Sequence, residues 1–295
     1  MTFPKPWVLG VVCLLAAAEE PRIRNARTET RAVSGDFEAA VAAIARQQPS
    51  GWFGYSIAVA RDGGWQNCSN VVHLEGAERA LVLGRIEGGA VTRIRTLPVE
   101  CEIDAGGQSF TWFTGVTQAQ SVRLLTGIVK AANSGNRERQ RLRDSAFSAL
   151  SQHSGAEAEQ AIEQFADAAQ PDWMRERAIS ALAQNREPKA TAALTAIARN
   201  DKTVRMRSFA VGRLADKLGP DAIPTLKAII RNDPSDEVMR QAVQGLTRVG
   251  EEHGVPALIE IARARDNPPA RKEAMRRLGQ AKDTRARAFL EEFVK

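Results

Sequence analysis

Apolar anchors return every 32 residues through the second half of the chain. The first set is leucine at all five occurrences, with alanine four residues earlier and a larger apolar residue three residues earlier: Leu150, Leu182, Leu214, Leu246 and Leu278. A second set follows at the same spacing: Ile162, Leu194, Leu226, Leu258 and Leu290. Apolar residues three and four positions apart share one face of a helix. Each 32-residue unit is therefore predicted to hold two helices.

Turn-forming residues separate the predicted helices. Within units they are Ser154-Gly155, Glu187-Pro188, Gly219-Pro220, and Gly254 with Pro256; between units they are Gln170-Pro171-Asp172, Asn200-Asp201, Asp233-Pro234 and Asn267-Pro268-Pro269. Asparagine, aspartate and proline end one helix and cap the next. A single helix pair cannot bury its apolar stripe alone, so the pairs are expected to stack. The sequence predicts an α-helical solenoid of five helix pairs over residues 136–295.

An arginine precedes the alanine and leucine anchors in most units, as in Met174-Arg175 and Met206-Arg207. Short HEAT repeats often open this helix with a valine–arginine pair, and the units resemble that family. They are similar to the HEAT-like repeats of phycobilin lyases and of secreted bacterial HEAT-repeat proteins. The resemblance implies a structural ladder in which the arginine pairs with an acidic or carbonyl group of the adjacent turn. The ladder positions are Arg143, Arg175, Arg207 and Arg271, with Met239 breaking the series.

Residues 36–135 have the pattern of a small α+β domain with an antiparallel sheet of three to five strands. Helices are predicted over 36–48, with an aspartate at the cap position, and from 118 to about 132. Alternating runs at 80–87 and 90–97 flank Gly88-Gly89 and predict a β-hairpin. Further strands are expected at 52–57 and 110–116, and the DAGG stretch at 104–107 is interpreted as a turn. The many aromatic residues here are interpreted as a compact core, with an aromatic-lined pocket or peptide groove as the alternative.

The N-terminus has the features of a secretory signal peptide over residues 1–18. Lys5 precedes a short apolar run that ends in Ala16 and Ala18. The run is shorter than the ~20 residues of a comfortable membrane span. Cleavage after about Ala18 is favoured over a start helix or an uncleaved anchor, and residues 19–35 are expected to be a linker. The predicted location is periplasmic or extracellular, with membrane contact only during export.

Two cysteines, Cys68 and Cys101, remain if the signal peptide is removed. An even pair in an exported chain predicts one disulfide, and the alternative is two buried free thiols. Neither cysteine belongs to a C-x-x-C pair, so a redox or zinc role has little support.

The sequence contains no motif for catalysis, a cofactor or a metal. His73, His153 and His253 lie far apart, without metal-ligand or nucleophile–histidine–acid spacing, and are interpreted as surface residues. The alternating acids Glu100, Glu102 and Asp104 are interpreted as a solvated edge rather than a calcium site. We therefore expect no catalytic residue, no bound metal and no cofactor.

Basic side chains recur on the predicted helices that carry the first leucine anchors. Positions not needed for packing hold Arg213, Lys217, Arg248, Arg276 and Arg277. In HEAT-type solenoids this helix tends to line the concave side. The cations therefore predict a groove for an acidic segment of a partner protein, and the alternative is a solvated face. A net charge of +6 is weak evidence for nucleic acid.

The favoured function is a non-catalytic protein–protein interaction scaffold of the bacterial cell envelope, acting as a monomer. The alternatives are an enzyme on a HEAT-like scaffold, such as a phycobilin lyase or an alkylpurine DNA glycosylase, and a structural envelope protein that self-associates through its solenoid ends. The near absence of aromatic residues on the repeat helices argues against a glycosylase. The polar last helix, residues 284–294, argues against end-to-end stacking.

Overall fold

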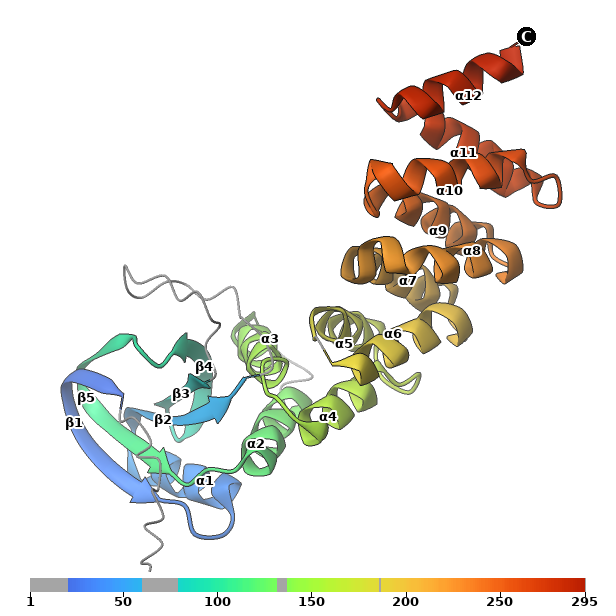
Figure 1. Ribbon diagram of the computed structural model, residues 1–295. Helices are drawn as coiled ribbons and strands as arrows, with labels where there is room; N and C mark the ends of the chain where they lie inside the picture. The colour runs from blue at the N-terminus through green and yellow to red at the C-terminus, as the bar shows by residue number, and fades with distance from the viewer. Residues whose placement is uncertain (1–20, 60–78, 132–136, 186, 295) are drawn as a thin grey trace, which may run out of the picture.

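The computed structural model describes residues 21–59, 79–131, 137–185 and 187–294, with side chains up to residue 292 (Figure 1). A small α+β domain comes first and a row of stacked helices follows it. The predicted solenoid preceded by an α+β domain is therefore confirmed. Within the described ranges, no helix is both long enough and apolar enough to cross a membrane.

The α+β domain contains a five-stranded sheet in the order β1-β5-β2-β3-β4. Its strands are β1 (Arg22–Ala32), β2 (Ser50–Ala58), β3 (Arg79–Glu87), β4 (Ala90–Pro98) and β5 (Glu102–Thr114). The predicted hairpin is present as β3 and β4, joined through Gly88-Gly89. Neighbours β2, β3 and β4 are antiparallel, but β5 is parallel to both β1 and β2. The sheet is thus mixed, because its antiparallel pairs cover only three of the five strands.

Residues 22–32, which the sequence places in a linker, form the edge strand β1. Its side chains are mostly exposed and polar or charged, so no apolar alternation indicates a strand. Charged residues are a common feature of edge strands because they discourage pairing with a further strand. The strand is held instead by its backbone ladder with β5, for example through Arg27 opposite Ser109 and Arg31 opposite Phe113.

The DAGG stretch lies inside β5 and forms an irregularity in the β1–β5 ladder instead of a turn between strands. Asp104 is opposite Arg24, but the next pair joins Gln108 to Ala26. Gly106 and Gly107 in between have φ values of 62° and 76°, which side chains other than glycine rarely adopt. These two glycines therefore absorb the extra residues of β5 and bend the strand.

Helices α1 (Phe37–Gln47) and α2 (Gln118–Ala131) contribute apolar side chains to the core on one face of the sheet. The ring of Phe37 packs edge-on against Tyr55 and Phe113, with centroids 5.0 and 5.2 Å apart. Phe53 lies over Gly84 on the neighbouring strand, where an added Cβ would come within 2.1 Å of the ring. The aromatic residues thus form a packed core, as the sequence indicates.

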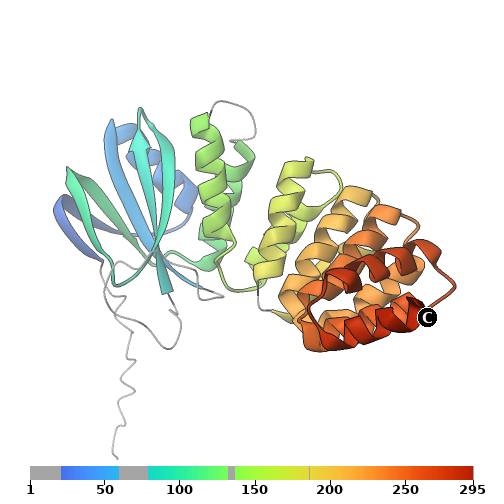
Figure 2. The ribbon, with the colours of Figure 1, turned by 90° about the horizontal axis from the view of Figure 1, so that it is seen from above.

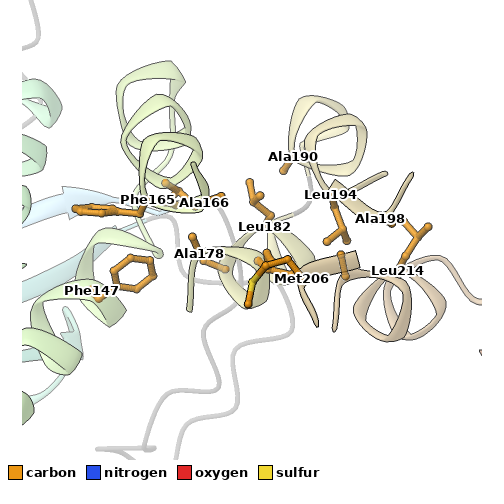
Figure 3. Close-up of a cluster of buried hydrophobic side chains, with 14 of the residues drawn as sticks. Phe147, Phe165, Ala166, Ala178, Leu182, Ala190, Leu194, Ala198, Met206 and Leu214 are labelled. Carbon is orange, nitrogen blue, oxygen red and sulfur yellow. The ribbon is translucent and has the colours of Figure 1, made fainter. Parts of the chain in front are cut away.

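All ten predicted solenoid helices are present. They are α3 (Arg137–Leu150), α4 (Ala156–Ala166), α5 (Asp172–Gln184), α6 (Pro188–Asn200), α7 (Val204–Leu218), α8 (Ile223–Asn232, after a 3₁₀ turn at Gly219–Ala222), α9 (Asp236–Arg248), α10 (Glu251–Arg263), α11 (Pro268–Gln280) and α12 (Thr284–Val294). The first-set leucine anchors are at most 1% exposed. Figure 3 shows Leu182, Leu194 and Leu214 pointing into one core shared by successive helices.

The first helix of the repeat array belongs to both parts of the molecule. Helix α3 packs against α2 and against β4, while α4 contacts α2 on one side and α5 on the other. Figure 2 shows α2 and α3 standing between the sheet and the remaining helices. The α+β domain therefore covers the end of the solenoid that begins with α3.

Candidate functional site

Two of the expected ladder arginines, Arg175 and Arg207, are buried and link successive turns between units. Nε and Nη2 of Arg207 donate to the carboxylate of Asp233 at 2.7 and 3.1 Å, and Nη1 donates to the carbonyl of Asp201 at 2.8 Å. Arg175 donates to the carboxylate of Asp201 and to the carbonyl of Ala166, the latter at 3.1 Å. The hydrogen bond to Asp233 raises the pKa of Arg207 above its ordinary value. These contacts are of the kind expected for a structural ladder.

The other ladder positions differ. The guanidinium of Arg143 lies over the ring of Trp173, 3.7 Å from its centroid, in a cation–π contact. Arg175 and Arg207 each bind an aspartate 26 residues further on. The residue at the corresponding position for Arg143 is Ala169, which has no carboxylate to bind. Arg271 is half-buried on α11, and Met239 is buried at the interrupted position.

The five predicted groove cations lie on α7, α9 and α11. Four of them form hydrogen bonds or ion pairs with other residues of the same chain. Nζ of Lys217 donates to the carbonyls of Ala183, at 3.3 Å, and Asn185, at the end of α5. Burial lowers the pKa of Lys217. Arg248 forms an ion pair with Asp216, with 3.4 Å between Nε and Oδ1.

Arg276 and Arg277 both bind the carboxylate of Glu273, the latter at 2.8 Å from Nε to Oε1. The hydrogen bond from Arg276 is the main cause of a lowered pKa for Glu273. Arg213 differs from the other four cations. Its guanidinium lies 5.0 Å from the centroid of the Phe209 ring, and no carboxylate in the described part of the chain pairs with it. An open row of cations is therefore not what the solenoid presents.

A surface hollow of about 470 Å³ lies over the middle of α7, and we call it the α7 hollow. Its lining comes from α5, α7 and α9: Glu176, Arg205, Ser208, Phe209, Gly212, Arg213, Asp216, Glu237, Gln241 and Arg248. It brings together two of the predicted cations, Arg213 and Arg248, and leaves out the pair on α11. Phe209 and Gln241 are lining residues that the sequence analysis did not single out. A glycine in the middle of a helix is the signal that could have marked position 212 as special.

His153, interpreted from the sequence as a surface residue, is instead buried between the two parts of the molecule. Its Nδ1 lies 2.9 Å from the carbonyl of Ala149, which accepts only, so the ring proton sits on Nδ1. Nε2 therefore accepts from the hydroxyl of Ser121 at 2.7 Å, and Ser121 lies 2.8 Å from the hydroxyl of Tyr55. Burial lowers the pKa of His153 to about 4 and raises that of Tyr55.

A serine beside a histidine is the arrangement that activates nucleophiles in hydrolases. Here Tyr55 and Ser121 are 0% exposed and His153 is 1% exposed, so no substrate reaches the Ser121 hydroxyl in this conformation. The backbone next to His153 is also tied to the sheet, because the N–H of Ser154 donates to the carbonyl of Ala58 at 3.3 Å. The network joins β2, α2 and the turn after α3.

The remaining predicted sites lie on or beside β5, at the exposed His253 on α10, or outside the described residues. Glu102 pairs with Arg24, and Asp104 accepts from the N–H of Gly106 at 2.8 Å. Among the described residues, no three histidine, cysteine or acidic side chains gather as metal ligands would. Cys101 is buried, whereas Cys68, His73 and the signal segment 1–18 lie outside the described residues, so the disulfide and the signal peptide stay predictions.

The fold places the chain in the class of helical-repeat proteins. More particularly, residues 223–295, which contain α8 to α12, match the family model described as HEAT repeats. No curated protein matches the chain in a sequence search.

Two solved structures illustrate what the chain is similar to. Human deoxyhypusine hydroxylase in complex with glycerol is 21% identical, with a TM-score of 0.37, over 59% of this chain and 67% of that one. The Escherichia coli protein YibA is 16% identical, also with a TM-score of 0.37, over 61% of this chain and 70% of that one. Likenesses this distant assign no function to the chain.

Proposed function

We propose that this chain is a non-catalytic scaffold of the bacterial cell envelope that holds a protein partner on the solenoid. The observation that carries the proposal is the α7 hollow, which spans α5, α7 and α9, the first helices of three successive units. HEAT repeats generally bind proteins, and stacked repeats create extended surfaces for such partners. A hollow of mixed charge beside a half-buried aromatic ring suits a protein surface.

The non-catalytic part of the proposal is supported by the burial of the Tyr55–Ser121–His153 network, the one serine–histidine contact that resembles catalytic chemistry among the described residues. The envelope location is supported by the sequence of residues 1–18 alone. Mass spectrometry of the chain isolated from its host tests this location. A mature N-terminus near residue 19 in the envelope fraction is the expected result, and an intact N-terminus in the cytosol would contradict it.

Site-specific photo-crosslinking in the host tests the partner. A photoreactive amino acid placed at Ser208, in the hollow, is expected to give one dominant adduct with a protein. The matched control carries the same amino acid at Arg231, which is exposed on α8 away from the hollow lining. Equal adducts from both positions, or none from Ser208 in an exported chain, would refute binding at this face.

A further inference from the structure

Gly212 stands in the middle of α7, where glycine costs a helix about 1 kcal/mol relative to alanine. Close packing explains two glycines of the next unit, Gly245 on α9 and Gly254 on α10. A Cβ at Gly245 would lie 3.2 Å from the buried side chains of Ala215 and Leu226, and one at Gly254 would lie 2.0 Å from the carbonyl oxygen of Leu246. Both positions exclude a larger residue, Gly245 because apolar side chains fill the space and Gly254 because the backbone of α9 does.

The surroundings of Gly212 are different. A Cβ there would lie 2.7 Å from Nε2 of Gln241 and 3.2 Å from Nη2 of Arg248. Both atoms are the ends of flexible side chains that reach across from α9, and neither belongs to the apolar core. The glycine therefore serves the surface: its missing side chain leaves room for two N–H donors on the floor of the α7 hollow.

These donors have few acceptors within the chain. Arg248 contacts Asp216 through Nε, at 3.4 Å, and its Nη2 is the atom that lies over Gly212. Among the described residues, none accepts a hydrogen bond from the Gln241 amide, and no carboxylate pairs with Arg213. Three side chains with N–H donors thus line one hollow. A carboxylate, which accepts through two oxygens, matches such a set.

The charges around the hollow restrict the kind of anion. Its lining holds three arginines and three acids, namely Arg205, Arg213, Arg248, Glu176, Asp216 and Glu237. Arg205 is already paired with Glu176, at 2.7 Å. A polyanion such as nucleic acid would meet three carboxylates here, whereas a single carboxylate beside a basic residue would complement both Arg213 and Glu237.

We propose that the α7 hollow binds one carboxylate side chain from a segment of a partner protein. The carboxylate accepts from Arg213, Gln241 and Arg248. An apolar residue of the same segment packs on Phe209, and a basic residue meets Glu237. This inference rests on the proposed scaffold function and names the chemistry of the segment that the scaffold holds.

The test uses the full chain and an array of peptides of about 12 residues, long enough to cross two units of a solenoid. Each peptide has a central Glu, with Leu or Phe and Lys varied around it, and a duplicate in which Gln replaces Glu. We expect the tightest Glu peptides to bind at least about tenfold more strongly than their Gln duplicates, because charged hydrogen bonds are lost. Equal binding of the duplicates, or no binding by any peptide, would overturn the proposal.

Gly212→Ala separates the hollow from the fold. The new methyl group displaces Gln241 and Arg248, while alanine favours the helix. We expect binding of the best Glu peptide to fall about tenfold with an unchanged or raised unfolding midpoint. The matched control is Gly279→Ala on α11, where no atom lies within 4 Å of the new Cβ, and it should bind like the wild type. If Gly212→Ala bound the peptide as tightly as the wild type, Gln241 and Arg248 would not be the donors to the carboxylate, and the proposal would be refuted.

The crosslinking experiment distinguishes the two proposals. If Ser208 captures a partner equally in the wild type and in the Gly212→Ala background, the scaffold function stands and the carboxylate site fails. If the Glu peptides bind in the expected way but no adduct forms in the host, the site stands and the scaffold function fails.

Discussion

Acidification should weaken the junction between the sheet and the solenoid through one residue, His153. The ring accepts a hydrogen bond from Ser121 only while Nε2 is unprotonated. Protonation would also leave the Tyr55–Ser121 pair to rearrange in a region sealed from water. Burial lowers the pKa of His153 from its ordinary 6.5 to about 4, so the unfolded chain takes up this proton first as the pH falls.

The magnitude follows from the two pKa values. Neutral His153 contributes fully to the free energy of unfolding above 6.5, the pKa of a histidine in the unfolded chain. This contribution is lost as the pH falls towards about 4, the pKa of His153 in the folded chain. Between about pH 7.5 and about pH 4.5 the loss amounts to about 2.5 kcal/mol, since each unit of pKa difference corresponds to about 1.4 kcal/mol. The ring is 1% exposed, so little solvent screening reduces this figure.

The assay is urea unfolding of the wild type and of His153→Asn at several pH values. Asparagine keeps a donor for the Ala149 carbonyl and does not titrate. Because carboxylates elsewhere titrate in both proteins, only the difference between them reports on His153. We expect the free energy of unfolding of the wild type, relative to that of the variant, to fall by about 2.5 kcal/mol between about pH 7.5 and about pH 4.5. A difference that stays constant over this range, or an NMR titration of His153 near pH 6.5, would refute the reasoning.

Three further substitutions test the packing. Arg207→Ala should destabilise the chain by about 3 kcal/mol in thermal or urea unfolding, because it leaves the buried carboxylate of Asp233 without its partner; adding Asp233→Ala should recover much of the loss, and no recovery would contradict the ladder. Gly84→Ala should cost about 1–3 kcal/mol by overpacking against Phe53, whereas Gly127→Ala, which faces open space on α2, should not destabilise; equal effects would contradict the cross-strand contact. Leu214→Ala, at a fully buried anchor, should cost about 2–5 kcal/mol in the same assay, and a loss below about 1 kcal/mol would show that the shared core is loosely packed there.

The solenoid could be predicted from the sequence because its contacts repeat at a fixed period. Every unit has the same spacing of alanine and leucine, so the five copies all indicate the same helix packing. The hairpin was equally accessible, since a two-glycine turn between alternating runs is a local signal. The strand β1 was not, because it is a polar edge whose position depends on backbone pairing with β5, about 80 residues away in the chain.

The state of the basic side chains depends on contacts that cross between units. Asp216 and Arg248 are one 32-residue period apart and occupy the same position in successive units. An alignment of the units could therefore have predicted this ion pair. Lys217 donates to backbone carbonyls, which are present at every residue. No side-chain pattern in the sequence could therefore predict these hydrogen bonds. The burial of His153 depends on how the turn after α3 meets β2, a contact between the two parts of the molecule that neither pattern encodes.

The covered first end of the solenoid has a consequence for how chains of this kind vary in length. The sheet and α2 close the side of α3. The helices that follow contact mainly their neighbours in the stack. Gain or loss of one whole 32-residue unit after α5 would therefore change how far the solenoid extends from the sheet while leaving this closure intact. Chains of this kind can thus vary the reach of the solenoid without altering the α+β domain that closes it.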